Sequence, residues 1–332
     1  MSVENLTLAE IETLAKQTLL AGGCDENNAN AIADTVTRAE RDGSTSHGLF
    51  RLPGYVKSMR SGKVDGKATP VIDNKMAAIV AVDGQGGYAP YTLQCALPVL
   101  AKAAQNTGIA VMRLHNSYHF AALWPEVEYL AEQNLVGLAC TCFKPSVAPA
   151  GTSTAFFGTN PLAFAWPRPD KTPVVFDMAT SRLAKGDVML AAREGHDLPD
   201  GTGLGPDGQP SNDPHEVLKG VLLPFGGYKG SAISMMVELL SSALTGDQFS
   251  YEAEAQDNND GGPARGGELI IAMSPDLIVG DGWRAHSEGF IAELSSLEGV
   301  RLPGERRHKN RQDTGTRAIN SALLETIRGL SG

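Results

Sequence analysis

The amino-acid sequence predicts an α/β protein, and three observations support this prediction. Apolar strand candidates alternate with helical stretches in the first half of the chain. For example, the strand candidate MAAIVAVD (76–83) is followed by a helical stretch at 91–105. More apolar strand candidates follow between residues 161 and 273. Helical patterns occur at both ends of the chain. The alternation alone favours a sheet with parallel strand pairing.

The N-terminal region is predicted to be helical. Thr7 and Glu10 have the spacing of a capping box, and an apolar helical face follows until the glycines at 22–23 end it. A second helix is expected over residues 25–41.

The rest of the chain is divided by the same signals. Strands are predicted at 76–83, 109–115, 136–143, 161–166, 173–179 and 267–273, and helices at 91–105, 124–134 and 231–244. Residues 198–214 are predicted to form a surface loop, and 301–311 a basic stretch. In a final helix, Ile319, Leu323, Ile327 and Leu330 are expected to share a face that packs on the N-terminal helices.

Composition and charge exclude several classes of function. The chain has 332 residues and a net charge of −10, without a broad basic face, so nucleic-acid binding is not expected. No apolar run is long enough to span a membrane, and the N-terminus lacks the features of an export signal. Four irregularly spaced cysteines do not form a disulfide framework. We therefore expect a soluble cytoplasmic protein.

One glycine motif resembles a dinucleotide-binding fingerprint but fails a second test. Gly84, Gly86 and Ala89 fit the G-x-G-x-x-A pattern between a strand and a helix. The fingerprint also needs an acidic residue about 20 positions later, and residues 85–125 contain neither Asp nor Glu. A simple glycine turn is the better interpretation. A nicotinamide cofactor, if one binds, is not expected to bind as in a Rossmann domain.

The densest group of reactive side chains lies in the segment 42–67, where Pro53 is expected to prevent a long helix. Ser46 and His47 could relay a proton, and Arg51 offers a planar fork for a carboxylate. The alternative is structural, with His47 capping a turn and Arg51 pairing with a surface acid. The sequence leaves these two readings about equally supported.

Other candidates are weaker on their own. His115 and His119 are four residues apart, but a zincin motif would need Glu in place of Asn116, so we expect no metal. Thr159 and Asn160 could present polar groups to a ligand or simply form a turn. Asp187 could be a helix N-cap or the carboxylate that orients a histidine. FGGYKG and GERRHKNR read as flexible or basic loops that could hold phosphates.

Taken together, six segments resemble the malate/L-lactate dehydrogenase family, which is unrelated to the lactate dehydrogenases of the Rossmann type. The segments are SHGLFRLPGY, HFAALWPEVE, FGTNPLAFAWP, FDMATSRLAKGDV, LLPFGGYKGSAISMMVELL and RLPGERR. Within the family, HFAALWP and A-x-G-D are most similar to the members that reduce cyclic imino acids with NADPH. Hydroxy-acid members commonly carry Gly-Lys where this chain has Gly186 and Asp187.

The resemblance implies a set of site residues. A proton relay is implied for Ser46, His47 and Asp187, and substrate contacts for Arg51, Thr159 and Lys185. Lys185 departs from the pattern, because a related member has His there. NADPH contacts are implied for His119, Phe120, Ala121, Ala122, Leu123, Asp177, Met178, Ala179, Tyr228, Lys229, Arg301, Gly304, Glu305, Arg306 and Arg307.

The resemblance also implies a fold and an assembly. The cofactor domain is expected to be of a non-Rossmann type with a mixed, largely antiparallel sheet. This conflicts with the parallel pairing that the alternation of strands and helices favours. The protein is expected to be a homodimer. We expect a helical domain from residues 1–70 with 300–332, and an α/β cofactor- and substrate-binding domain over 71–299. A 2-hydroxy-acid dehydrogenase of the same family, and a non-catalytic carboxylate-binding protein, are the alternatives.

Overall fold

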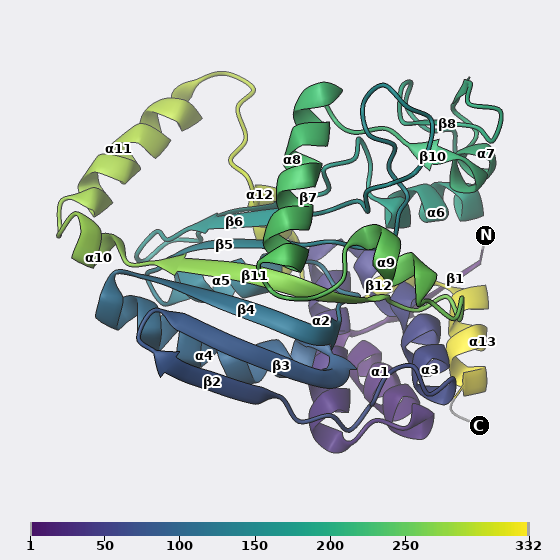
Figure 1. The fold of residues 1–332 in the computed structure, drawn as a ribbon, viewed down its shortest axis with the longest axis horizontal. Coiled ribbons are helices and arrows are strands. Elements are labelled where there is room, and N and C mark those ends of the chain that lie inside the picture. Colours follow the sequence, from purple (N-terminus) through teal and green to yellow (C-terminus); the bar gives the residue numbers. More distant parts are fainter. Residues whose placement is uncertain (1, 331–332) are drawn as a thin grey trace.

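The computed structural model describes residues 2–330 and is built around one seven-stranded sheet (Figure 1). The strand order is β2-β3-β4-β11-β5-β6-β7. The bounds are β2 (Val71–Met76), β3 (Ile79–Tyr88), β4 (Ile109–Tyr118), β11 (Arg265–Met273), β5 (Val136–Thr141), β6 (Leu162–Trp166) and β7 (Val174–Met178).

The sheet is mixed and largely antiparallel. Among the described strands of this sheet, β3 and β4 pair in parallel, and every other neighbouring pair is antiparallel. The parallel pairing favoured by the alternation of elements was therefore wrong for most of the sheet. Two of the antiparallel pairs arise because β11, which comes from late in the chain, inserts between β4 and β5 and runs antiparallel to both. The pairs β2-β3, β5-β6 and β6-β7 are antiparallel independently of β11. The mixed sheet implied by the family resemblance is confirmed.

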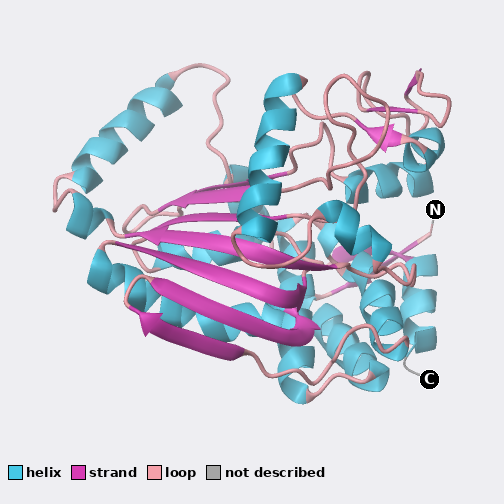
Figure 2. Cartoon of the chain, in the orientation of Figure 1, coloured by secondary structure: helices cyan, strands magenta, loops and turns pink. Residues whose placement is uncertain are grey.

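Helices cover both faces of the sheet (Figure 2). On one face lie α4 (Ala89–Thr107) and α5 (Trp124–Glu132), which contribute Leu100, Trp124 and Val127 to a core shared with the strands. On the other face, α8 (Tyr228–Glu238) and the π-helical turn Leu239–Ala243 pack against β5 and β11. The sequence prediction placed one helix over 231–244 and did not foresee this change of winding.

A group of helices packs beside the sheet, and both described ends of the chain belong to it (Figure 1). It consists of α1 (Leu8–Gly22), α2 (Glu26–Asp42), α3 (Leu52–Arg60) and α13 (Ser321–Leu330). The capping box of Thr7 and Glu10 is present, and α13 packs on α1 and α3 as expected. The division of the chain into two domains stays a prediction.

Three local expectations about the helices need correction. Ile319 lies in a short strand, β12 (Arg317–Asn320), which pairs with β1 (Val3–Leu6), so it is not part of the last helix. Pro53 occupies the first turn of α3, where its missing N–H costs nothing, so it starts a helix and does not simply break one. The basic residues after Gly304 form the helix α12 (Glu305–Gln312).

The predicted surface loop and the glycine motif are also more ordered than expected. Residues 198–214 contribute β8 (Gly203–Leu204) and β9 (Pro210–Ser211), which join β10 (Val221–Leu222) beside α7 (Pro214–Lys219). The motif at Gly84 and Gly86 is an irregularity inside β3, where the register to β4 shifts between Asp83 and Gly87. Its last residue, Ala89, begins α4.

The remaining helices are α6 (Lys185–Glu194), α9 (Ser250–Ala255), α10 (Pro275–Ile278) and α11 (Trp283–Ser296). The sequence reading missed α10 and α11. In Figure 1, α11 stands away from the sheet. Within the described residues, none of the helices combines the length and the apolar character needed to cross a membrane.

Candidate active site

The segment of residues 45–51 joins the end of α2 to the start of α3 through two short 3-10 turns, Thr45–His47 and Leu49–Arg51. The turns are closed by backbone bonds from His47 N–H to Ser44 and from Arg51 N–H to Gly48. Ser46 Oγ lies 3.2 Å from His47 Nδ1, close enough to share a proton. The structure therefore brings together the Ser and the His that the sequence placed next to each other.

Arg51 projects into a cavity of about 250 Å³. Its guanidinium carbon lies 4.6 Å above the ring of Phe120, a cation–π contact that fixes the plane of the fork. Within residues 2–330, the buried Nε of Arg51 has no hydrogen-bond partner. Burial lowers the pKa of Arg51 to about 10, so the group stays charged at neutral pH. A buried, unpaired guanidinium in a cavity is suited to binding a carboxylate.

His47 lines the same cavity, and its surroundings disfavour the protonated imidazole. Burial, and then the positive charges of Arg51 and His119, lower the pKa of His47 to about 3. The imidazole is therefore neutral at pH 7 when the cavity holds no anion. An anion bound to Arg51 would cancel part of this positive field and make His47 easier to protonate.

The N-terminus of α6 closes the other side of the segment. A Cβ on Gly186 would lie 2.8 Å from Arg51 Nη2 and 3.1 Å from Ser46 Cβ, so a larger residue would displace the guanidinium of Arg51. Lys185 lines the cavity of Arg51. Asp187 is exposed, and in the described part of the chain no hydrogen bond joins it to His47. Its place in a relay stays a prediction.

A second cavity of about 380 Å³ adjoins the first, and His47, Ala121 and Thr159 line both. Of the predicted cofactor contacts, this cavity is lined by Ala121, Ala122, Leu123, Asp177, Met178, Ala179, Arg306 and Arg307. Ser46 and Asp187 line it as well. The cavity thus joins the predicted relay to the predicted cofactor residues.

Two anchors shape the second cavity. Asp177, at the end of β7, accepts hydrogen bonds from the backbone N–H groups of Leu123 and Trp124, at 2.8 and 3.0 Å, and so holds the start of α5. Arg307 donates to the carbonyl of Val175, while its buried Nε has no partner in the part of the chain that the structure describes. The side chain of Arg306 is exposed.

The other predicted cofactor contacts lie elsewhere. His119 and Phe120 line the first cavity but not the second. In the described chain, neither cavity is lined by Tyr228, Lys229, Arg301, Gly304 or Glu305. Tyr228 is 72% exposed at the start of α8. The contacts of these five residues stay predictions.

Thr159 stands at the junction of the two cavities because Asn160 fixes the turn that carries it. Asn160 is fully buried with a positive φ of 38°, and its amide donates to Glu238 at 2.8 Å. The carbonyl of Thr159 accepts from the N–H and the hydroxyl of Thr180. Both readings of the sequence thus apply, since the residues form a turn and the turn places Thr159 in the cavities.

His119, which lines the first cavity, forms with Glu126 and Glu268 a largely buried trio that the sequence reading did not predict. Nε2 of His119 is 3.5 Å from Glu126 and 3.6 Å from Glu268. One possible ligand atom from each residue lies within 4.8 Å of the others, so the trio could hold a cation. Burial lowers the pKa of His119, but the two carboxylates raise it more, to about 9. A proton on His119 can offset one carboxylate, and the absence of a metal stays our prediction.

The trio should make the protein less stable at alkaline pH. The pKa of His119 is raised from 6.5 to about 9, and burial raises that of Glu268 from 4.5 to about 8. Both groups hold more protons in the folded than in the unfolded chain over these intervals, so stability falls as pH rises through them. Between pH 7 and 9 the free energy of unfolding should therefore fall as pH rises, by on the order of 1 kcal/mol per pH unit for the trio as a whole.

Thermal melts between pH 6.5 and 9 would measure this slope, and the Glu268→Gln variant should flatten it. EDTA should change neither curve. A melting temperature that stays constant or rises from pH 7 to 9 would show that the trio is not protonated as inferred.

The sequence reading missed Glu126, Glu268 and Glu40, the last of which contacts the 45–51 segment. Glu268 could have been noticed, because it is a lone charge in the apolar strand GELIIAM. Glu126 follows His119 by seven residues in a motif that was singled out for other members. Glu40 has no sequence signal, since it lies among charged residues at the end of an amphipathic helix.

Comparisons with known proteins agree over almost the whole chain. The family model described as malate/L-lactate dehydrogenase matches residues 6–328. The Δ1-pyrroline-2-carboxylate reductase of Ancylobacter novellus is 44% identical, covering 98% of this chain and 97% of its own. The Δ1-pyrroline-2-carboxylate/Δ1-piperideine-2-carboxylate reductase of Pseudomonas putida is 45% identical, covering 100% of this chain and 98% of its own. The crystal structure of Δ1-piperideine-2-carboxylate reductase from Pseudomonas syringae pv. tomato superposes with a TM-score of 0.92 at 42% identity, covering 98% of this chain and 99% of its own.

Proposed function

The chain belongs to the malate/L-lactate dehydrogenase family, and on this premise we propose that it reduces the C=N bond of cyclic imino acids. The substrates are Δ1-piperideine-2-carboxylate, which gives L-pipecolate, and Δ1-pyrroline-2-carboxylate, which gives L-proline. The relatives at 44% and 45% identity are both named as reductases of Δ1-pyrroline-2-carboxylate, and the second is also named as a reductase of Δ1-piperideine-2-carboxylate. In the structure, the observation that carries the proposal is the unpaired guanidinium of Arg51 in a cavity that it shares with His47.

Arg51 binds the substrate carboxylate in this proposal. Its planar fork can donate two parallel hydrogen bonds, and its stacking on Phe120 fixes the direction of the fork. The carboxylate is attached to C2, the carbon that is reduced, so clamping it also orients the C=N bond. Thr159 and Lys185, which line the same cavity, are the further substrate contacts that we propose.

His47 supplies the proton. C2 accepts a hydride readily only when the ring nitrogen is protonated, so a donor must face that nitrogen. His47 lines both cavities, and Ser46 Oγ, 3.2 Å away, can exchange a proton with it. Asp187 is proposed as the carboxylate that favours the charged imidazole once substrate and cofactor fill the cavities.

The cofactor that we propose is NADPH, which when bound supplies the hydride. The second cavity suits it because two cations, Arg306 and Arg307, line it together with His47, and the buried Nε of Arg307 lacks a partner among the described residues. Arginine forks match the phosphate oxygens that distinguish NADPH from NADH.

Neutralising both arginines should therefore remove the preference for NADPH. In the double variant Arg306→Ser with Arg307→Ser, the ratio of kcat/KM for NADPH to that for NADH should fall about 100-fold or more, because each lost charged hydrogen bond is worth about 1.5–3 kcal/mol. Lys309→Ser, an exposed cation on the same helix, is the matched control. A ratio that is unchanged in the double variant would assign the 2′-phosphate to other residues.

The activity itself is tested by following the loss of NADPH absorbance with Δ1-piperideine-2-carboxylate and, separately, with pyruvate. We expect rapid oxidation with the imine. Turnover of pyruvate alone would make the protein a 2-hydroxy-acid dehydrogenase, and cofactor binding without turnover of either would make it a binding protein.

We also propose that two copies form a dimer and that the enzyme works in the cytoplasm. An apolar groove of about 560 Å³ lies between β6, β7 and α11 and is lined by Phe164, Trp166, Val174, Trp283 and Phe290 among others. Phe290 is 66% exposed, which suits a surface that a second copy covers. Light scattering should give twice the 35.0 kDa of one chain.

The cytoplasmic location is supported by four cysteines that are free thiols.

A further inference from the structure

A buried carboxylate supports the 45–51 segment from behind. Glu40 lies in the last turn of α2 and is 4% exposed. Its Oε1 accepts a hydrogen bond from the backbone N–H of Leu49 at 2.7 Å. Leu49 begins the second 3-10 turn, which ends at Arg51. The bond therefore ties the middle of the segment to a long helix.

The contact is close as well as polar. A Cβ added to Gly48 would collide with Oε1 of Glu40, so the carboxylate rests directly on the backbone between the two turns. Ser46 and His47 precede this point, and Arg51 follows it. Glu40 thus touches the chain at the joint that sets His47 and Arg51 relative to each other.

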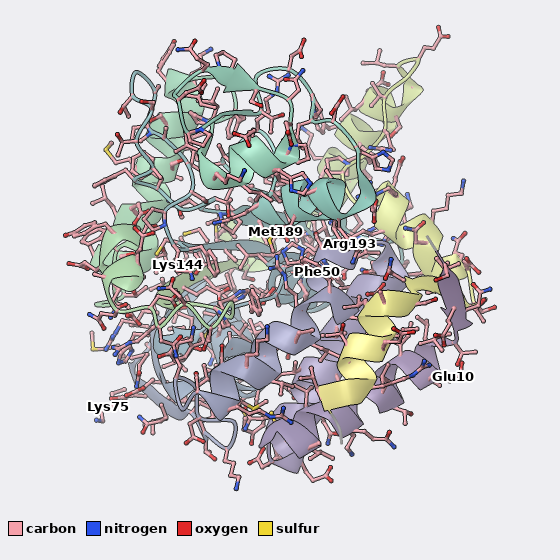
Figure 3. All side chains as sticks on the ribbon, turned by 90° about the vertical axis from the view of Figure 1, so that its right-hand side faces the viewer. Glu10, Phe50, Lys75, Lys144, Met189 and Arg193 are labelled. Atoms are coloured by element: carbon pink, nitrogen blue, oxygen red, sulfur yellow. The ribbon has the colours of Figure 1, made fainter. Side chains whose placement is uncertain are left out.

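On the opposite side, α6 limits how far the segment can move. The position of a Cβ on Gly186 is 2.8 Å from Arg51 Nη2 and 3.1 Å from Ser46 Cβ. The segment is therefore held between Glu40 and Gly186. In Figure 3, Phe50 and Arg193 lie next to each other where α6 meets the helices, and the guanidinium carbon of Arg193 is 5.5 Å from the Phe50 ring centroid.

Keeping a carboxylate at this place is costly for the fold. In the described chain, no cation lies within salt-bridge distance of Glu40, and burial raises its pKa to about 7. An apolar side chain there would avoid the cost of desolvating a charge. An apolar side chain, however, could not accept the hydrogen bond from the N–H of Leu49.

We propose that Glu40 is a positioning residue for the reduction. By accepting the hydrogen bond from the N–H of Leu49, it holds the 45–51 segment so that Arg51 and His47 contact the same substrate molecule. The inference rests on the proposed function. It assigns Glu40 no contact with substrate or cofactor, and it requires a hydrogen-bond acceptor that reaches Leu49 and does not require a charge.

Three variants separate the effect of side-chain length at position 40 from the effect of its charge. Glu40→Gln keeps an acceptor at the same reach and loses the charge, whereas Glu40→Asp keeps the charge and is one methylene too short. Glu40→Ala removes both. Because displacements of about 1 Å can cost 100-fold in rate, we expect kcat/KM for the imine to fall about 100-fold in the Asp and Ala variants, with KM raised and kcat lowered. The Gln variant should stay within about threefold of the wild type.

Two controls show that a loss comes from positioning. NADPH affinity, measured by cofactor fluorescence, should change much less than kcat/KM for the imine, because Glu40 bonds to Leu49 and the arginines proposed to hold the cofactor lie on α12. Asp34→Asn removes an exposed carboxylate from the same helix, where it pairs with Arg38, and should behave as wild type. Thermal melts identify any variant that fails to fold. If Glu40→Ala does not fold, the comparison of Glu40→Asp with Glu40→Gln tests whether an acceptor of the right reach is needed.

Wild-type kinetics in the Asp variant would overturn the proposal, and so would a Gln variant as impaired as the Ala variant. If the wild-type enzyme reduces no imine, the proposed function fails instead, and the wild-type assay alone reveals that result.

Discussion

Replacing Arg51 by methionine should lower kcat/KM for the cyclic imine by a factor of about 30 to several thousand. Arg51 is a cation of the first cavity whose buried Nε has no partner in the described chain, and removing one partner of a buried charged pair costs about 2–5 kcal/mol. Arg51→Lys keeps the charge but loses the second arm of the fork and the stacking on Phe120, so it should recover only part of the loss. Both KM and kcat should change, because the carboxylate is held next to the reacting carbon.

Steady-state kinetics with the imine at saturating NADPH measure the effect. Arg60→Met is a suitable control, since Arg60 lies on α3 with its guanidinium exposed at the surface and bonded to a backbone carbonyl. Unchanged kinetics in Arg51→Met would remove Arg51 from the site and, with it, the main structural support for a carboxylate substrate.

The parts of the fold that were predictable are those set by neighbouring residues. The capping box at Thr7, the start of α2 after Asp25 and the buried face of α1 depend on residues within one or two turns. Strand pairing is different, because it joins residues far apart in the chain. Nothing near 267–273 indicates that this strand inserts between β4 and β5, and only the resemblance to a family pointed to an antiparallel sheet.

The same distinction applies to the candidate site. Ser46, His47 and Arg51 lie within six residues, so their nearness along the chain is enough to group them. The nearness of α6 to this segment depends on Gly186, more than 130 residues later, and no local pattern could have shown it. Glu268 meets His119 only because β11 pairs with β4, although the two residues are about 150 positions apart in the chain.

Removing the imidazole of His47 should lower kcat about 100- to 10,000-fold, the range for loss of a positioned acid or base. His47→Asn keeps a polar side chain of similar width without a group that titrates near neutral pH. The lowered pKa of His47, about 3, predicts the direction of the pH dependence. In the free enzyme the imidazole is neutral, so it must take up a proton when the substrate carboxylate neutralises Arg51. This uptake becomes harder as pH rises, and kcat/KM of the wild type should therefore fall between pH 6 and 9.

The pH profile of the variant distinguishes His47 from its neighbours. If His47 carries the proton, the small remaining activity of His47→Asn should lose the pH dependence that the wild type shows, apart from the titration of the imine itself, which is measured separately in solution. If the variant keeps both high activity and the wild-type profile, the proton must come from elsewhere. His119 is then the group to test, because it lines the same cavity and its raised pKa of about 9 keeps it protonated over most of this range. The Glu268→Gln variant would move that second profile to lower pH, since removing a neighbouring carboxylate lowers the pKa of His119. A profile governed by His47 would not move to lower pH, because less positive charge on His119 can only raise the pKa of His47.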